Sequence, residues 1–191
     1  MRKAILLLTL VLLIFPLKAQ LLKVEVMPQI GFTNGSTILD SSLFSIKMSS
    51  GVNFGIRTDI MFTFIGVQLY YNVNSLETNA FDKLLNVDLD FSDKFVNYGI
   101  GVVVESPGIL IHPFVSATYG RTKFSGSHRY APDGKHYSLG AGIKAGLGKI
   151  GVWGEIRLLR VMDSLQNYKD FFKDTGSFTT FSASGGMLFS L

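Results

Sequence analysis

After residue 20 the sequence alternates between apolar and small or polar residues, and this period of two recurs along most of its length. The clearest stretch is 137–148, whose apolar positions are Tyr137, Leu139, Ala141, Ile143, Ala145 and Leu147. The segments 65–72 and 181–191 show the same alternation. Successive side chains of a strand point to opposite faces, so the pattern indicates strands with one apolar and one polar face. No apolar run of roughly 20 residues follows residue 20, so a passage through a membrane would have to use strands.

The alternating segments predict eight strands and two classes of connection. The strands are expected near 23–34, 46–57, 61–73, 94–105, 110–122, 137–148, 151–162 and 178–191. Short connections are expected near 58–60, 106–109 and 149–150, and long ones at 35–45, 74–93, 123–136 and 163–177. Short turns on one side and long loops on the other are typical of an outer-membrane barrel with both termini in the periplasm. The predicted fold is an all-β, eight-stranded antiparallel transmembrane up-and-down β-barrel.

The alternative to a membrane barrel is a soluble barrel of lipocalin type, with its apolar face turned inward around a ligand. The composition of the polar face distinguishes the two. A water-facing surface is roughly a quarter to a third charged, whereas this chain is 17% charged and its polar positions are mostly glycine, serine, threonine and asparagine. Small residues suit the crowded lumen of a narrow barrel. We therefore expect the apolar face to contact lipid.

Residues 1–19 have the features of a cleavable signal peptide. Arg2 and Lys3 precede an apolar segment at 4–17, and Leu17-Lys18-Ala19 forms a small-residue cleavage site. The alternative is an uncleaved anchor, although the apolar segment is short for a spanning helix. We expect export through residues 1–19 and a single barrel domain at 20–191, located in the bacterial outer membrane.

The charge of the chain comes largely from this leader. The formal net charge is +4, but the leader holds three of the 18 basic residues and no acid, which leaves 15 basic against 14 acidic residues. A nearly neutral domain has no electrostatic reason to bind nucleic acid. The sequence contains no cysteine, so disulfides and thiolate metal sites are excluded, and nothing in it indicates a cofactor.

Three segments and the C-terminal strand resemble a known group of proteins. They are Ser-Gly-Val-Asn-Phe-Gly-Ile at 50–56, Gly-Val-Gln-Leu-Tyr-Tyr-Asn at 66–72 and Leu-Gly-Ala-Gly-Ile-Lys-Ala-Gly-Leu-Gly-Lys-Ile-Gly-Val-Trp-Gly-Glu-Ile-Arg at 139–157. The chain is similar to outer-membrane β-barrel proteins of the PorT-like kind and, more distantly, to the small OmpX, OmpW and OmpA barrels. Members of this group usually end in an aromatic residue that the barrel-assembly machinery reads. This chain ends in Leu191 rather than in an aromatic residue, with Phe189 two positions before it. The resemblance implies that Phe189 and Leu191 form the assembly signal.

Charged residues on the polar face predict an ion pair inside the lumen. If the turn at 148–151 sets Gly148 opposite Gly151, counting back places Lys144 opposite Glu155, with Arg157 one step further. Isolated charges in a lumen are costly, so these residues are expected to form a network that plugs the bore.

His136-Tyr137-Ser138 resembles the His-x-Ser pair of the PagL-type lipid A deacylases, which are also eight-stranded barrels. In that chemistry His136 would be the base for Ser138. The following residues, Leu139-Gly140, depart from the family motif, and the strand phase turns both residues toward the lumen rather than toward lipid.

The loops differ in charge, with acidic residues gathered at 74–93 and basic residues at 121–136. One interpretation is that the loops are solvated, or that they form weak ion pairs with each other. The other interpretation is that the basic residues contact the phosphates of lipopolysaccharide. The residues concerned are Arg121, Lys123, Arg129, Lys135 and Arg160.

Three functions remain open on this basis. The first is a non-enzymatic protein that stabilises the envelope or presents its loops to an envelope partner, and the PorT-like resemblance implies secretion or assembly. The second is a narrow channel for small solutes. The third is a lipid A hydrolase centred on His136 and Ser138. The expected partners are outer-membrane lipid, lipopolysaccharide and the barrel-assembly machinery.

Overall fold

The computed structural model describes residues 22–40, 44–82, 87–108, 110–125, 134–162 and 177–191, so the predicted signal peptide lies outside the described residues. In this part of the chain no helix is long and apolar enough to cross a membrane. The strands are β1 (Lys23–Thr33), β2 (Ser36–Asp40), β3 (Phe44–Met48), β4 (Gly51–Phe62), β5 (Ile65–Asp82), β6 (Val87–Glu105), β7 (Ile111–Ser125), β8 (Gly134–Leu147), β9 (Ile150–Met162) and β10 (Phe178–Ser190).

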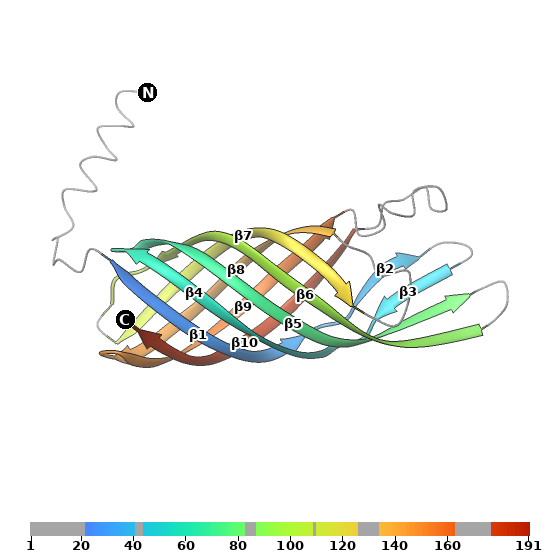
Figure 1. Ribbon diagram of the computed structural model, residues 1–191, viewed down its shortest axis with the longest axis horizontal. Helices are drawn as coiled ribbons and strands as arrows, with labels where there is room; N and C mark the ends of the chain where they lie inside the picture. Colours follow the sequence, from blue (N-terminus) through green and yellow to red (C-terminus); the bar gives the residue numbers. More distant parts are fainter. Residues whose placement is uncertain (1–21, 41–43, 83–86, 109, 126–133, 163–176) are drawn as a thin grey trace, which may run out of the picture.

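Eight of these strands, β1 and β4 to β10, close into an antiparallel up-and-down barrel (Figure 1). Each pairs with its neighbour in sequence, and β1 pairs with β10 to complete the ring. Closure leaves no open sheet edge in the wall, which is what a hydrocarbon environment requires of strands. The predicted fold class is confirmed.

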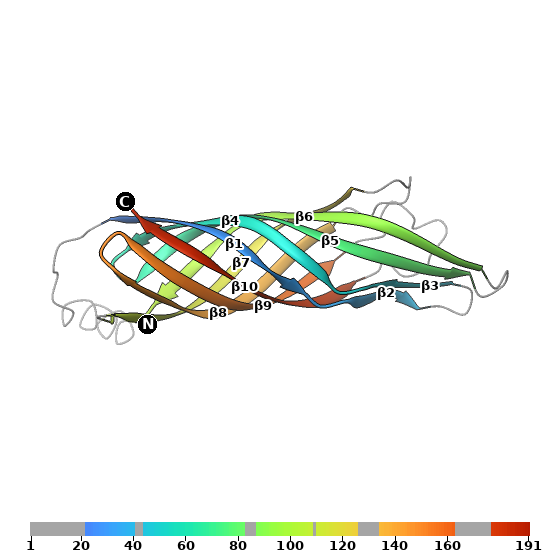
Figure 2. The ribbon, with the colours of Figure 1, turned by 90° about the horizontal axis from the view of Figure 1, so that it is seen from below.

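The strands tilt strongly relative to the barrel axis (Figures 1 and 2). The paired residues can be followed around the barrel from Glu155 of β9, strand by strand. Through β8 and β7 they lead to Glu105 of β6, whereas through β10, β1, β4 and β5 they lead to Phe95, ten residues away on the same strand. This stagger is the shear that closes a tilted barrel. It brings side chains that are distant in the flat ladder to the same level of the lumen.

The two faces of each strand meet different environments. Along β9, outward positions such as Val152, Ile156 and Leu158 are about half exposed, whereas Trp153 and Glu155 between them are buried inside. The wall is therefore apolar outside, while the interior holds buried charged and polar side chains. This is the reverse of a lipocalin, so the soluble alternative is wrong.

The turn between the second and third predicted strands is misplaced by several residues. The turn expected at 58–60 lies instead at Thr63 and Phe64, because Phe62 pairs with Ile65 across a two-residue connection. Residues 46–48, expected to begin the second barrel strand, belong to β3 instead. Thr63 has a φ of 63°, the left-handed geometry that tight hairpin turns require and that threonine rarely adopts. Nothing in the residue types at this turn marks it.

Pro28 interrupts the ladder on one side only. β1 pairs with β4 from Lys23 onward, with Pro28 opposite Ile56. Its pairing with β10 stops after Val26 and resumes at Ile30 in the same register. Proline lacks the N–H that this side of the ladder needs, so the gap is local.

The long-loop end carries a sheet that continues beyond the barrel wall (Figures 1 and 2). β5 and β6 contain 18 and 19 residues, while a tilted spanning strand needs roughly 9–11. Lys94 is the outermost residue of β6 that pairs with β7. Beyond it, among the described residues, β6 pairs only with β5, and β5 pairs with β6 and with β3. The β2–β3 hairpin adds to the free side of β5. Much of the stretch 74–93 that was expected as a loop is therefore strand.

Candidate functional site

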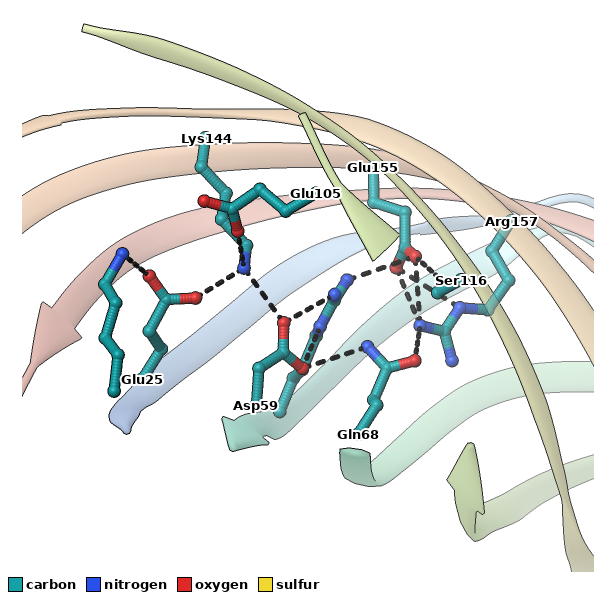
Figure 3. Close-up of polar contacts among 10 residues, drawn as sticks. Glu25, Asp59, Gln68, Glu105, Ser116, Lys144, Glu155 and Arg157 are labelled. Atoms are coloured by element: carbon teal, nitrogen blue, oxygen red, sulfur yellow. Dashed lines mark hydrogen bonds and ion pairs between the residues drawn. The ribbon is translucent and has the colours of Figure 1, made fainter. Parts of the chain in front are cut away.

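The middle of the lumen is filled by a layer of buried charged and amide side chains (Figure 3). It draws on strands β1, β4, β5, β6, β8 and β9. Its members, which we call the ionic layer, are Glu25, Arg57, Asp59, Gln68, Glu105, Lys144, Glu155 and Arg157.

Lys144 is the centre of one half of the ionic layer. Its Nζ donates to Glu105 Oε2 at 2.7 Å and to Asp59 Oδ2 at 3.0 Å, and it also binds Glu25. Glu25 has a second cation in Lys23, near the barrel mouth, and Glu105 has His112, whose Nδ1 lies 3.2 Å away. The three carboxylates around Lys144 come from β1, β4 and β6, so one lysine ties together three separate strands.

Arg57 connects this half to the other. Its guanidinium donates through Nε and Nη2 to both oxygens of Asp59, at 2.9 and 2.7 Å, and through Nη1 to Glu155 at 3.2 Å. The guanidinium also lies 4.4 Å from the ring centroid of Phe114 and 5.5 Å from that of Trp153. Planar guanidinium groups combine bidentate pairing with aromatic stacking, which lysine cannot reproduce.

Arg157 and Glu155 form the second half. Arg157 Nη2 donates to Glu155 Oε2 at 2.8 Å, and Ser116 Oγ donates to Glu155 Oε1 at 2.9 Å. Glycines on the inner face of β8 make room for this carboxylate, since a Cβ at Gly140 would lie 2.1 Å from Glu155 Oε1. Small residues therefore stand opposite the large charged ones.

Together with Lys23, which pairs with Glu25 from outside the layer, the charges of the ionic layer balance. Lys23, Arg57, Lys144 and Arg157 face the carboxylates of Glu25, Asp59, Glu105 and Glu155. A buried charge is costly unless it is paired and hydrogen-bonded, so the layer is tolerable only as a complete set.

A second polar layer lies toward the long-loop end and is organised around His136. Thr122 Oγ1 donates to Asn97 Oδ1 at 2.7 Å, so it must accept a hydrogen bond from His136 Nδ1, 2.9 Å away. His136 Nε2 is hydrogen-bonded to the Tyr70 hydroxyl. The network therefore places a proton on Nδ1, and both imidazole nitrogens have partners.

Little free volume remains between these layers. A polar cavity of about 20 Å³ lies among Tyr70, Asn74, Asn97, Glu155 and Arg157 and their neighbours, and this is room for about one water molecule. One apolar cluster, around Met27 and Trp153, packs against the Lys144 half of the ionic layer, and another, around Phe95 and Val161, lies toward the long-loop end. At the levels of these layers and clusters, buried side chains occupy the bore.

The predicted Lys144–Glu155 pair is wrong in its partner. The β8–β9 turn is a two-residue connection with Leu147 opposite Ile150, so Glu155 lies opposite Gly142 and Lys144 opposite Trp153. The register differs by two residues from the one expected, which keeps the side chains on the same face but changes every partner. All three predicted residues, Lys144, Glu155 and Arg157, lie in the ionic layer.

The charged residues of β1 and β4 escaped the sequence analysis. Glu25 was not singled out, and the misplaced turn at 58–60 hid Arg57 and Asp59. Arg57-Thr58-Asp59 and Glu155-Ile156-Arg157 share one signal, two opposite charges spaced by two residues within apolar surroundings. On a strand that spacing puts both charges on one face.

The structure does not bring His136 and Ser138 together as a catalytic pair. Both are buried in the lumen, Ser138 Oγ bonds Thr118, and the imidazole bonds Tyr70 and Thr122. A lipid deacylase needs its nucleophile and base exposed to lipid, and this geometry offers neither.

The basic residues predicted to contact lipopolysaccharide lie on the outside. Arg121, Lys123, Lys135 and Arg160 are exposed at the long-loop ends of β7, β8 and β9. Arg129 lies outside the described residues.

The two residues of the C-terminal assembly signal are accessible. Phe189 is 40% exposed on β10 and Leu191, just after it, is 76% exposed. Their reading by the assembly machinery stays a prediction.

The part of the chain that the structure describes contains no group of three or more His, Cys, Asp or Glu side chains able to hold a metal ion.

Solved structures with a similar chain path are outer-membrane barrels. Neisserial surface protein A, NspA, matches with a TM-score of 0.59 and 11% identity, covering 88% of this chain and 96% of that one. The N-terminal β-barrel domain of Pseudomonas aeruginosa OprF has a TM-score of 0.46 and 12% identity, covering 86% and 96%. Ail of Yersinia pestis has a TM-score of 0.41 and 15% identity, covering 86% and 98%.

No protein-family model matches the sequence, and no curated protein matches it. The likeness to NspA shows that the two chains share the fold of small outer-membrane barrels. The finer PorT-like resemblance stays a prediction.

Proposed function

We propose that this protein is a non-enzymatic barrel of the bacterial outer membrane that holds a β-sheet outside the bilayer for a partner protein to bind. The observation that carries the proposal is the sheet formed by β2, β3 and the outer parts of β5 and β6. β5 and β6 belong to the barrel wall, β3 pairs with β5 and β2 pairs with β3, so the sheet projects as a continuation of the wall rather than as a separate loop.

One edge of this sheet is open among the described residues. From Val87 to Asp93, β6 pairs with β5 on one side and with no described strand on the other. Seven strand residues extend roughly 23 Å at about 3.3 Å each. Unpaired backbone N–H and C=O groups along such an edge are a template for an added strand.

The sequence of this edge suggests the character of the partner segment. Val87, Leu89 and Phe91 alternate with Asp88 and Asp90. An extended segment with alternating apolar and basic residues would complement it in both hydrogen bonding and charge. Envelope secretion or assembly, the role implied by the PorT-like resemblance, is the narrower form of this proposal.

The filled lumen supports this function over that of a solute channel. Eight-stranded barrels have interiors just wide enough for side chains, and here the ionic layer occupies that space. A wall that only needs to be stable and closed is suited to carrying an external sheet.

Photo-crosslinking on intact cells tests the proposal. A photoreactive amino acid at position 90, on the open edge, should give a discrete protein adduct, whereas one at Ile100, on the lipid-facing wall, should not. Replacing residues 77–92 by a short turn should abolish binding of the same partner while leaving a folded, heat-modifiable barrel. Identical adduct patterns from positions 90 and 100, or no protein adduct from position 90, would contradict the proposal.

A further inference from the structure

Three outward-facing cations lie close together on adjacent strands at the long-loop end of the wall. Arg121 of β7 stands directly opposite Lys135 of β8. Arg160 of β9 stands opposite Tyr137, one row nearer the membrane centre and diagonal to Lys135. Directly opposed Cβ atoms are about 5 Å apart and diagonal ones about 7–8 Å, so the long side chains of all three residues reach a common point.

The Arg121–Lys135 pair is unfavourable as it stands. Like charges directly opposite each other destabilise a strand pair. None of the ion pairs formed among the described side chains supplies a carboxylate to Arg121, Lys135 or Arg160. An anion bound between them would remove the repulsion.

The cations follow directly on the apolar wall. On β7 the outward residues from Ile111 to Tyr119 are uncharged, and Arg121 comes next; on β9 the run from Ile150 to Leu158 is followed by Arg160. Eight strand steps at about 3.3 Å, tilted by about 40°, span about 20 Å, close to the roughly 25 Å apolar band of such barrels. The cations therefore lie at headgroup level.

Tyrosines mark the same level. Tyr119 and Tyr137 are paired across β7 and β8 and both are about half exposed, directly below Arg121 and Lys135. Aromatic residues gather where the acyl chains meet the headgroups. A lipid whose phosphate meets the cations would rest its acyl chains against this tyrosine pair and the apolar wall below.

The cluster is confined to one side of the barrel. At the same end of β1, β4 and β10, the outward residues are Phe32, Val52 and Thr179, all uncharged. A general preference for basic residues at the membrane surface would distribute them around the wall. Lys94 of β6, the strand next to β7, is also exposed at this end, so the outward cations gather on one side of the wall, which is typical of a site.

We propose that Arg121, Lys135 and Arg160 form a binding site for the phosphate groups of an outer-leaflet glycolipid of the lipid A class. Guanidinium and ammonium groups form charge-assisted hydrogen bonds with phosphate oxygens, and arginine does so in a bidentate manner. Lys123, one outward position beyond Arg121, lies 5.9 Å from the Tyr98 ring and borders the site. The inference rests on the proposed location, since it places the long-loop end of the barrel in the outer leaflet.

Titration of the refolded barrel with lipid A, followed by native mass spectrometry, tests the site. The wild type should bind bisphosphorylated lipid A at least about tenfold more tightly than dephosphorylated lipid A, because tenfold corresponds to the strength of one charge-assisted hydrogen bond. The variant Arg121→Gln, Lys135→Gln, Arg160→Gln should lose that preference. Lys149→Gln, an exposed lysine in the turn at the other end, is the matched control and should keep it.

Two results would overturn the inference. One is an unchanged preference for the phosphorylated lipid in the triple variant. The other is displacement of lipid A by millimolar inorganic phosphate, which would make this a simple anion site. The crosslink from position 90 is measured in the otherwise wild-type protein and depends on the proposed function alone. Its absence, with the wild-type preference for phosphorylated lipid A present and lost in the triple variant, would count against that function and not against this site.

Discussion

At the scale of single residues, ion pairs between buried charged side chains determine which residues the middle of the lumen can hold. Lys144 contacts three carboxylates, and Arg57 joins Asp59 to Glu155 while stacked against Phe114. Removing one member of such a set leaves its partners charged, buried and unpaired, which costs far more than the set contributes when complete. Each charged side chain of the ionic layer is thus required by the others.

Replacing Lys144 with methionine should therefore destabilise the folded barrel by about 3–5 kcal/mol, the usual cost of breaking a buried pair. The side-chain volume is nearly kept, so the loss reports the charge. Urea unfolding in lipid bilayers measures the change. Lys149→Met, at the exposed turn, should stay within about 0.5 kcal/mol of the wild type.

A double-mutant cycle distinguishes the observed contacts from those expected from the sequence. Lys144 and Glu105, which are in contact, should show a coupling of at least about 1 kcal/mol. The coupling of Lys144 to Glu155 should be smaller, because these two residues are connected only through Asp59 and Arg57. Stronger coupling of Lys144 to Glu155 would favour the register that the sequence predicted and contradict the observed one.

At the scale of elements, the two-residue turns set the register of the lumen. Both the β4–β5 and the β8–β9 connections need a residue with positive φ, and Gly148 meets this with a φ of 69°. Thr63 meets it with a φ of 63° at the cost of backbone strain, because a β-branched side chain crowds the backbone there. The two turns thus have nearly the same backbone φ at this position and differ in the residue type that adopts it.

Thr63→Asn should stabilise the barrel by about 0.5–1 kcal/mol, since asparagine tolerates the left-handed region. Gly148→Ala, the reciprocal change in the matching turn, should destabilise it by about 1 kcal/mol. Chemical unfolding of both variants in the same bilayer gives the comparison. A neutral or destabilising Thr63→Asn would show that this turn is not strained.

At the scale of the whole molecule, the barrel separates two tasks. The lumen is closed by charged, polar and apolar layers, while the wall and the projecting sheet present the surfaces available to lipid and protein. A conducting path would require continuous water, and the polar cavity between the layers has room for about one water molecule.

The purified protein should consequently show no discrete ion-conducting steps in planar bilayers under applied voltage. An open porin reconstituted in the same way provides the positive control, and heat-modifiability confirms that the protein is inserted and folded. Reproducible single-channel openings of the wild-type protein would contradict the closed lumen and restore the channel as a candidate function.

The sequence alone was sufficient for the fold class, most strand positions and the orientation of the faces, because alternation and the residue types of each face are local properties of the chain. It also indicated that Lys144, Glu155 and Arg157 point inward, since facing depends only on parity along a strand.

The partners within the lumen were decided only by the tertiary structure. Which carboxylate meets Lys144 depends on turn length, register and shear, and these place Glu25, Asp59 and Glu105 beside it from three strands. A shift of two residues leaves every face unchanged and every contact different. The continuation of β5 and β6 beyond the wall was likewise decided by their pairing with each other and by the pairing of β5 with β3, contacts between segments whose local pattern also fits a loop. The alternation of residues along a strand determines which face each side chain is on, whereas its contacts depend on how the strands pair in the closed barrel.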